Sequence, residues 1–308
     1  GVAGSESVKG YGVLSRRPLQ VFLFGIFVVA LAGLPPFPGF WSKWALVRTL
    51  APSGGLVWVV FIILGSLLEV AYLFRWFGYA VRGHEDHSIP RPAGAGRGAE
   101  KHLVMILFAV LLIALGHLYA EWMLAGPVIM ALPMAGAAGL LLFERFHPRI
   151  RGIVAIATTA YLSTLVLPSL EGLPLFFSLI FLGGGMLVLI ASLHRNTDSK
   201  GFYPLMVLTT GSLAVLSFSS TPLEFFFAWE VMTVASYLLV LRGRKAMRPA
   251  LVYMLFSAAG AYLVMAAFGI SGEPFFGAGG RLPAVSAGPL PVAVFVLYET
   301  LDSSMADL

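Results

Sequence analysis

The chain has 308 residues, of which 58% are hydrophobic and only 11% are charged, with a formal net charge of +5. Soluble domains carry about 25% charged residues, so this composition excludes a soluble protein. The chain has no cysteine, which excludes disulfides, thiolate zinc sites and iron–sulfur ligation by its own residues.

Apolar runs long enough to cross a bilayer follow one another along most of the chain. A hydrocarbon core about 30 Å thick needs about 20 apolar residues in a helix. The runs lie at 18–50, 55–81, 102–123, 125–143, 150–168, 173–194, 202–220, 222–241 and 248–270. The sequence therefore predicts an all-α fold, a polytopic membrane helix bundle with about nine spans.

Three prolines and a glycine interrupt the first run, 18–50. As one helix this run would be about 50 Å long at 1.5 Å per residue, which exceeds the membrane core. Proline cannot continue hydrogen bonding inside a helix, and glycine adds backbone freedom. We therefore expect a discontinuous first span, with half-helices at 18–34 and 41–50 joined by an unwound link. The residues of the predicted break are Pro35, Pro36, Pro38 and Gly39.

Lys43 follows this break within the same apolar run. Unwound backbone at membrane depth is tolerated where it is buried in protein or lines a water-filled cavity, and broken helices mark ion sites in transporters. A desolvated lysine beside such a break can exchange protons. The pattern favours a proton-relay role for Lys43 over the alternative, an interfacial loop with the lysine among the lipid head groups.

Glu69 lies in the middle of the run 55–81, and the loop that follows this run is polar. Glu69 has no opposite charge three or four residues away, so it is not neutralised within its own helix.

The polar loop after this run contains the sequence His84, Glu85, Asp86 and His87. Adjacent residues point in different directions and no second ligand set is near, so a solvated loop is favoured and no metal site is predicted.

Glu230 occupies the same kind of position in the run 222–241, again without an opposite charge one turn away. An isolated carboxylate in either run takes up a proton, pairs with a charge on another helix or lines a hydrated cavity. All three outcomes suit a proton relay through Lys43, Glu69 and Glu230. The alternative for each acid is a permanently protonated side chain with a structural hydrogen bond.

Basic residues fall in alternate loops along the whole chain. The segments that carry them are the leader and the loops 82–101, 144–151, 194–201 and 242–248, which hold 16 of the 20 lysines and arginines. By the positive-inside rule these segments face the cytoplasm, as expected for a multi-pass protein of the cell (inner) membrane. The basic excess therefore reflects topology, and nucleic-acid binding has no support.

Four segments carry a resemblance to a known family. The stretch at the break, LAGLPPFPGFWSKW, resembles the twelfth-helix motif of the antiporter-like proton-translocating subunits of respiratory complex I, membrane-bound nickel–iron hydrogenases and Mrp-type Na⁺/H⁺ antiporters. LVWVVFIILGSLLEVAYLFRWF resembles their thirteenth helix, FYPLMVLTTGSLAVLSFSSTPLEFFFAWEVMTVASYLLV their fourth and fifth, and GRKAMRPALVYMLFSAAGAYLVMAAFGI their sixth. The resemblance implies that residues 1–124 are the end of one module, helices 12–14, and residues 125–308 the beginning of a second, helices 1–6 and a tail.

The resemblance also implies a function. Lys43 falls where the family carries a relay lysine or glutamate, and Glu230 falls on its fifth-helix glutamate. The implied protein translocates H⁺, or exchanges Na⁺ for H⁺, as a subunit of a redox-driven complex of the NADH-quinone oxidoreductase or hydrogenase type. Its expected partners are other membrane subunits, electron-transfer subunits that carry the redox cofactors, and the lipid bilayer; no cofactor is expected on this chain.

Two other functions remain open at this point. Helices 7 to 11 of either module have no counterpart in the 308 residues, which favours a non-conducting scaffold or assembly subunit of such a complex as the alternative. A solute carrier that binds a small molecule at the broken helix has less support, because no repeat is visible within the chain.

Overall fold

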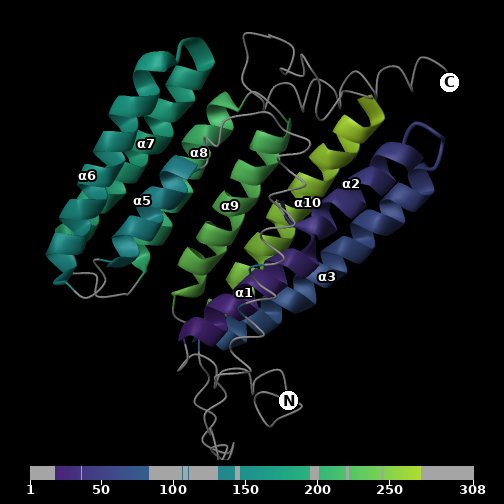
Figure 1. Cartoon of the computed structure of the whole chain (residues 1–308), viewed down its shortest axis with the longest axis horizontal. Helices are drawn as coiled ribbons and strands as arrows, with labels where there is room; N and C mark the ends of the chain where they lie inside the picture. Colours follow the sequence, from purple (N-terminus) through teal and green to yellow (C-terminus); the bar gives the residue numbers. More distant parts are fainter. Residues whose placement is uncertain are drawn as a thin grey trace, which may run out of the picture. The chain divides into compact units, whose positions relative to one another are not determined.

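The computed structural model describes residues 18–35, 37–82, 106, 110, 131–142, 146–194, 201–219, 222–243 and 246–271. In these ranges the regular structure is helical and no strand occurs (Figure 1). The helices are α1 (Pro18–Ala32), α2 (Pro38–Leu50), α3 (Leu56–Arg82), α5 (Ala131–Leu142), α6 (Pro148–Val166), α7 (Gly172–His194), α8 (Phe202–Phe218), α9 (Pro222–Leu241) and α10 (Met247–Ser271), with a 3₁₀ turn at Leu167–Ser169 after α6.

These helices agree with the predicted membrane spans. Within the described ranges, five helices are long and apolar enough to cross a membrane, α3, α6 with its 3₁₀ turn, α7, α9 and α10, and α1 and α8 are shorter apolar helices. The prediction of a polytopic membrane helix bundle with a discontinuous first span is confirmed. The span 102–123, apart from residues 106 and 110, lies outside the described residues, as do the loop with His84–His87 and the predicted module boundary at 124.

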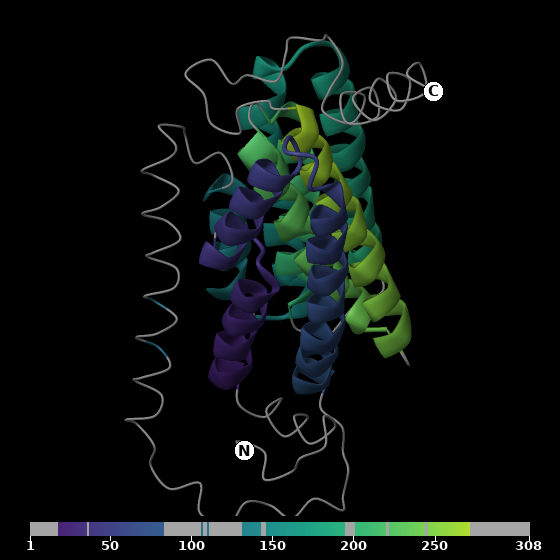
Figure 2. The ribbon, with the colours of Figure 1, turned by 90° about the vertical axis from the view of Figure 1, so that its right-hand side faces the viewer.

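The chain forms two compact units, each described here by itself. The first contains α1, α2, α3 and residues 240–262, and thus the larger part of α10; the second contains α5 to α8, α9 up to residue 239, and the end of α10. Figure 2 shows α1 and α2 of the first unit as consecutive short helices that run beside α3. The division into sequence modules 1–124 and 125–308 stays a prediction.

Helix α1 ends where glycine permits a left-handed turn. Gly33 has φ of 73°, its N–H donates to the carbonyl of Ala30 at 3.2 Å, and the next N–H, of Leu34, reaches back to Val29 at 3.3 Å. This pair of bonds is the Schellman arrangement, which satisfies carbonyls at the end of a helix. The unwound link therefore starts at Gly33, close to the end predicted for the first half-helix.

Helix α2 begins at Pro38, three residues before the predicted start at 41. Pro38 and Gly39, which were expected in the unwound link, are instead its first two residues. Proline is tolerated at the first helical position because the N–H it lacks would have no partner there. Gly39 serves close packing, since a Cβ would lie 2.8 Å from the carbonyl oxygen of Ala30.

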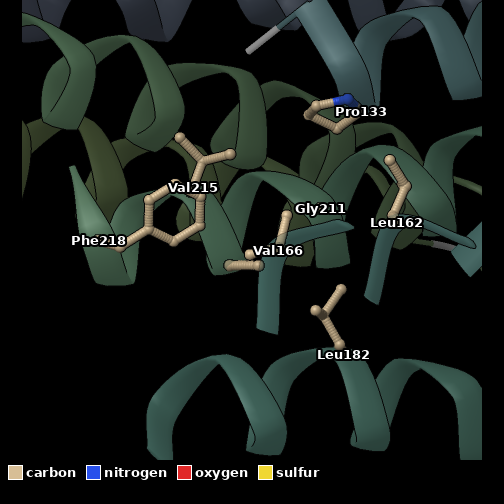
Figure 3. A pocket seen from close by; sticks show the side chains of 8 residues that line it. Pro133, Leu162, Val166, Leu182, Gly211, Val215 and Phe218 are labelled. Carbon is tan, nitrogen blue, oxygen red and sulfur yellow. The ribbon is translucent and has the colours of Figure 1, made fainter. Parts of the chain in front are cut away.

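The second unit packs α5, α6, α7 and α8 around an apolar core. Its buried cluster includes Leu140, Ala155, Leu162, Leu189, Tyr203 and Val207. A cavity of about 20 Å³ lies among these helices, with Pro133, Leu162 and Leu182 in its lining (Figure 3). The volume holds about one water molecule, but its lining offers no polar partner, so such a space stays dry and is not a ligand site.

Gly185 permits a close contact between α7 and α8. A Cβ at this position would overlap the side chain of Thr210 and lie 2.9 Å from its Cβ, whereas a Cβ at the adjacent Gly184 would meet nothing within 4 Å. Helix pairs in membranes associate through such small residues. The two neighbouring glycines therefore form a matched pair for testing this contact.

We expect Gly185→Ala to lower the free energy of unfolding by about 1–3 kcal/mol, because the added methyl overpacks the interface. Gly184→Ala should leave the free energy unchanged or raise it by up to about 1 kcal/mol, because alanine favours the helix. Denaturant titration in detergent, followed by circular dichroism, measures both. Equal effects of the two substitutions would contradict this account of the α7–α8 contact.

Candidate functional site

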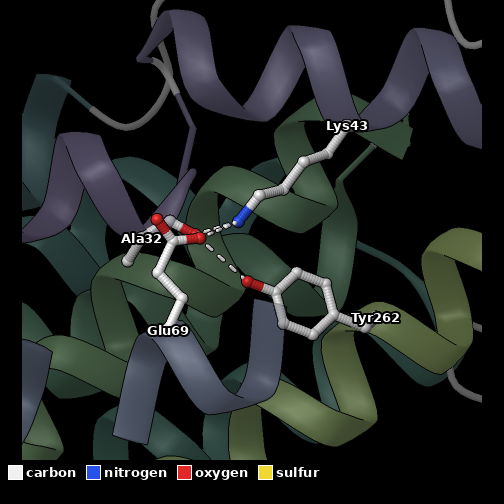
Figure 4. Close-up of polar contacts among 4 residues, drawn as sticks. All are labelled: Ala32, Lys43, Glu69 and Tyr262. Atoms are coloured by element: carbon white, nitrogen blue, oxygen red, sulfur yellow. Dashed lines mark hydrogen bonds and ion pairs between the residues drawn. The ribbon is translucent and has the colours of Figure 1, made fainter. Parts of the chain in front are cut away.

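The structure brings Lys43 and Glu69 together beside the helix break. The Nζ atom of Lys43 lies 2.9 Å from Oε2 of Glu69 and donates a second hydrogen bond, of 2.8 Å, to the carbonyl oxygen of Ala32 (Figure 4). The two charged side chains are 17% and 30% exposed. Of the outcomes foreseen for Glu69, the structure thus shows a partner on another helix.

The backbone of the first unit creates the space that Lys43 occupies. A Cβ on Gly33 would lie 2.9 Å from both Cε and Nζ of Lys43, so the absence of a side chain there lets the lysine pass over the end of α1. On α3, Glu69 is next to the buried Val70 and one turn after the buried Ser66. These positions direct the two charged groups toward each other, inside the α1–α2–α3 unit.

The Ala32 carbonyl needs a donor because of the proline sequence that follows it. In a continuous helix this carbonyl would accept the N–H of residue 36, and that residue is a proline without an N–H. The C-terminal end of α1 also carries partial negative charge. The Lys43 ammonium satisfies the carbonyl, meets the negative end of α1 and is neutralised by Glu69.

The unwound link is buried in the protein. Ala32 is fully buried, and Leu34, Pro35 and Phe37 are buried as well. This is one of the two settings in which irregular backbone is tolerated at membrane depth. Pro36, which the sequence analysis also assigned to the break, lies outside the described residues.

Tyr262 of α10 also belongs to this site, and the sequence analysis did not identify it. Its hydroxyl donates to the same Ala32 carbonyl at 3.2 Å, and its ring centroid lies 5.8 Å from Nζ of Lys43, within the range of a cation–π interaction. One signal was available in the sequence, namely the carbonyl that Pro36 leaves without an N–H. Nothing in the sequence indicates that a residue 230 positions away supplies the donor.

Glu230 belongs to the second unit, and Lys43 and Glu69 to the first. It is 7% exposed and lies on a buried face of α9, with Phe226 one turn before it and Thr233 one turn after it, both almost fully buried. The ring of Phe225 lies 5.6 Å from that of Trp229 on the same helix. The structure thus places Glu230 inside the second unit.

The other basic residues in the apolar runs 18–50 and 55–81 are Arg48 and Arg75, and both are exposed, as expected for side chains that extend toward the membrane surface. Among the described residues no group of histidines, aspartates and glutamates could hold a metal ion. The chemistry that the described site offers is therefore that of an ammonium and a carboxylate in contact.

No known protein-family model matches the chain, and no solved structure matches it. Parts of it are similar to proteins named NADH-quinone oxidoreductase subunit N: that of Cytophaga hutchinsonii (32% identity over 93 residues, 30% of this chain and 20% of the relative), that of Desulforudis audaxviator (30% over 131 residues, 40% and 26%) and subunit N 2 of Symbiobacterium thermophilum (30% over 120 residues, 39% and 23%). The chain thus spans about a quarter or less of these relatives. The resemblance to the antiporter-like subunits is confirmed, and the relatives named here are all of the NADH-quinone oxidoreductase type.

Proposed function

We propose that the chain is part of a proton-translocating membrane subunit of an NADH-quinone oxidoreductase, with Lys43, Glu69 and Glu230 as proton-relay groups. The observation that carries this proposal is the Lys43–Glu69 contact of 2.9 Å at a buried helix break. Charged side chains inside a membrane are costly and are found mainly at functional sites. The similarity to subunit N proteins supports the same function.

Proton transfer across the pair is chemically simple. One N–H of the Lys43 ammonium points along the hydrogen bond to Oε2 of Glu69; breaking this N–H bond and forming an O–H bond leaves a neutral amine and a neutral carboxylic acid. Both states, the ion pair and the neutral pair, have zero net charge, so neither leaves an uncompensated charge in the apolar bundle. A proton can therefore move between the two groups without a counter-ion from outside the site.

Energy and partners come from outside this chain in our proposal. Redox chemistry in electron-transfer subunits of the complex drives the relay, and neighbouring membrane subunits complete the pathway for the proton. The protein lies in the inner membrane, with the leader and the basic loops on the cytoplasmic side. We propose H⁺ as the transported ion, since lysine and glutamate both exchange protons.

The test is proton pumping by the full-length protein in its complex, reconstituted into vesicles that contain a pH-sensitive dye. We expect Lys43→Ala and Glu230→Gln each to reduce the pumping rate on the order of tenfold or more, because proton transfer by a positioned side chain is worth 10²–10⁴-fold. Arg48→Gln, which removes an exposed charge from α2, is the matched control and should pump normally.

Complex assembly is measured in the same preparations by native electrophoresis. Intact pumping in both Lys43→Ala and Glu230→Gln would show that the relay assignment is wrong. A different result would favour the alternative, the non-conducting scaffold. In that case the complex pumps normally with either substitution, but it does not assemble when the helices of this chain are deleted.

A further inference from the structure

Tyr262 and Lys43 donate hydrogen bonds to a single acceptor, the carbonyl oxygen of Ala32 (Figure 4). The distances are 2.8 Å from Nζ and 3.2 Å from the hydroxyl. A backbone carbonyl has two lone pairs and accepts both donors. The oxygen that α1 cannot satisfy internally thus has two donors from two different helices, α2 and α10.

One of the two donors has a second partner. Lys43 also contacts Glu69 at 2.9 Å, and a relay lysine that hands a proton on to a further acceptor turns its Nζ toward that acceptor. Ala32 is fully buried, and a buried carbonyl that loses its only donor carries the full desolvation penalty. If Lys43 were the sole donor, each departure of its amine from the break would incur that penalty.

Tyr262 removes this conflict. Its hydroxyl is held by a helix other than those that carry the ion pair, and its side chain is 5% exposed. Its ring centroid lies 5.8 Å from Nζ. The tyrosine hydroxyl can therefore donate to the carbonyl while Nζ of Lys43 keeps its own hydrogen bonds. Nothing in the relay chemistry requires the tyrosine hydroxyl to leave.

We propose that Tyr262 is a positioning residue: it keeps the Ala32 carbonyl hydrogen-bonded when Lys43 moves away, so that the helix break keeps its shape during proton transfer. This inference rests on the proposed relay function of Lys43. It assigns to α10 a part in the α1–α2 break, although the relay residue of that break is on α2.

The shared acceptor makes a distinctive prediction for stability. Tyr262→Phe and Lys43→Met each leave one donor on Ala32, while the double variant leaves none. We therefore expect the thermal unfolding midpoint of the full-length protein to fall further in the double variant than the two single shifts combined, by an excess on the order of a few degrees. Two independent contacts would give additive shifts, which would overturn the shared-acceptor proposal.

Pumping by the reconstituted complex tests the positioning role. Tyr262→Phe should slow pumping on the order of tenfold, because small misplacements of supporting groups can cost up to about 10²-fold. Tyr72→Phe is the control, since it removes a hydroxyl from an exposed tyrosine of α3 and should pump at the normal rate. A normal rate in Tyr262→Phe, with pumping lost in Lys43→Ala, would overturn the positioning role alone.

The two readouts separate this inference from the function on which it rests. If Lys43→Ala pumps normally, the relay is wrong and the positioning role for it is wrong too. The stability cycle needs no pumping, so it would still show whether Tyr262 and Lys43 share the Ala32 carbonyl.

Discussion

Lys43→Met should lower the free energy of unfolding by about 2 kcal/mol, because it leaves the Glu69 carboxylate without its partner. Breaking a fully buried ion pair costs about 3–5 kcal/mol; a smaller value is expected here because the two side chains are 17% and 30% exposed. Methionine is an unbranched side chain one heavy atom shorter than lysine, and it carries no charge. The Ala32 carbonyl keeps its bond to Tyr262, so the loss comes mainly from the carboxylate.

A second substitution should restore the stability but not the function. In Lys43→Met/Glu69→Gln both charges are gone, so no charge is left without its partner, and the amide of residue 69 lies at a partly exposed position. We expect the free energy of unfolding, measured by denaturant titration in detergent, to return to within about 1 kcal/mol of the parent protein. Pumping should stay reduced, on the order of tenfold or more, in both variants. A double variant as unstable as Lys43→Met would show that Glu69 is not the source of the loss.

Gly33→Ala should have a still larger effect, a loss of about 3 kcal/mol in the free energy of unfolding. A left-handed backbone costs a residue with a Cβ roughly 1–2 kcal/mol, and overpacking adds about 1–3 kcal/mol. Both apply at this position, since φ is 73° and the new methyl would lie 2.9 Å from Cε and Nζ of Lys43. Displacing that side chain should also slow pumping.

Gly54 provides the matched control for this prediction. It lies between α2 and α3 of the same unit with φ of 78°, but a Cβ there would meet nothing within 4 Å. Gly54→Ala should therefore show only the backbone cost, about 1 kcal/mol, and pump normally. Denaturant titration of the two variants separates the terms, and equal losses would mean that contact with Lys43 is unimportant.

The helices could be predicted from the sequence because each long apolar run has a clear physical meaning. The predicted run 222–241 coincides with α9, and α3 and α10 begin and end within a residue of their predictions. The start of α2 was wrong because proline has two roles. It ends a helix from the interior and begins one at the first position, and the sequence PPFP does not say which proline is which.

The polar site could be predicted only in part. Sequence reasoning identified Lys43 by its place beside the helix break and Glu69 as a charge that its own helix does not neutralise. That they are each other's partners depends on how α2 packs against α3, which no local pattern encodes. The role of Tyr262 depends on how α10 packs against the end of α1. Tyrosine carries no charge that would have singled this residue out in the sequence.

Neither half of the broken first span is long enough to cross a bilayer alone. Helices α1 and α2 have 15 and 13 residues, so they are about 22 Å and 20 Å long at 1.5 Å per residue, against a hydrocarbon core of about 30 Å. The Lys43 charge meets its counter-charge only when α3 is present. We therefore expect residues 18–50 to be stable in the lipid only together with α3, which supplies Glu69, so that α1, α2 and α3 should insert as one unit.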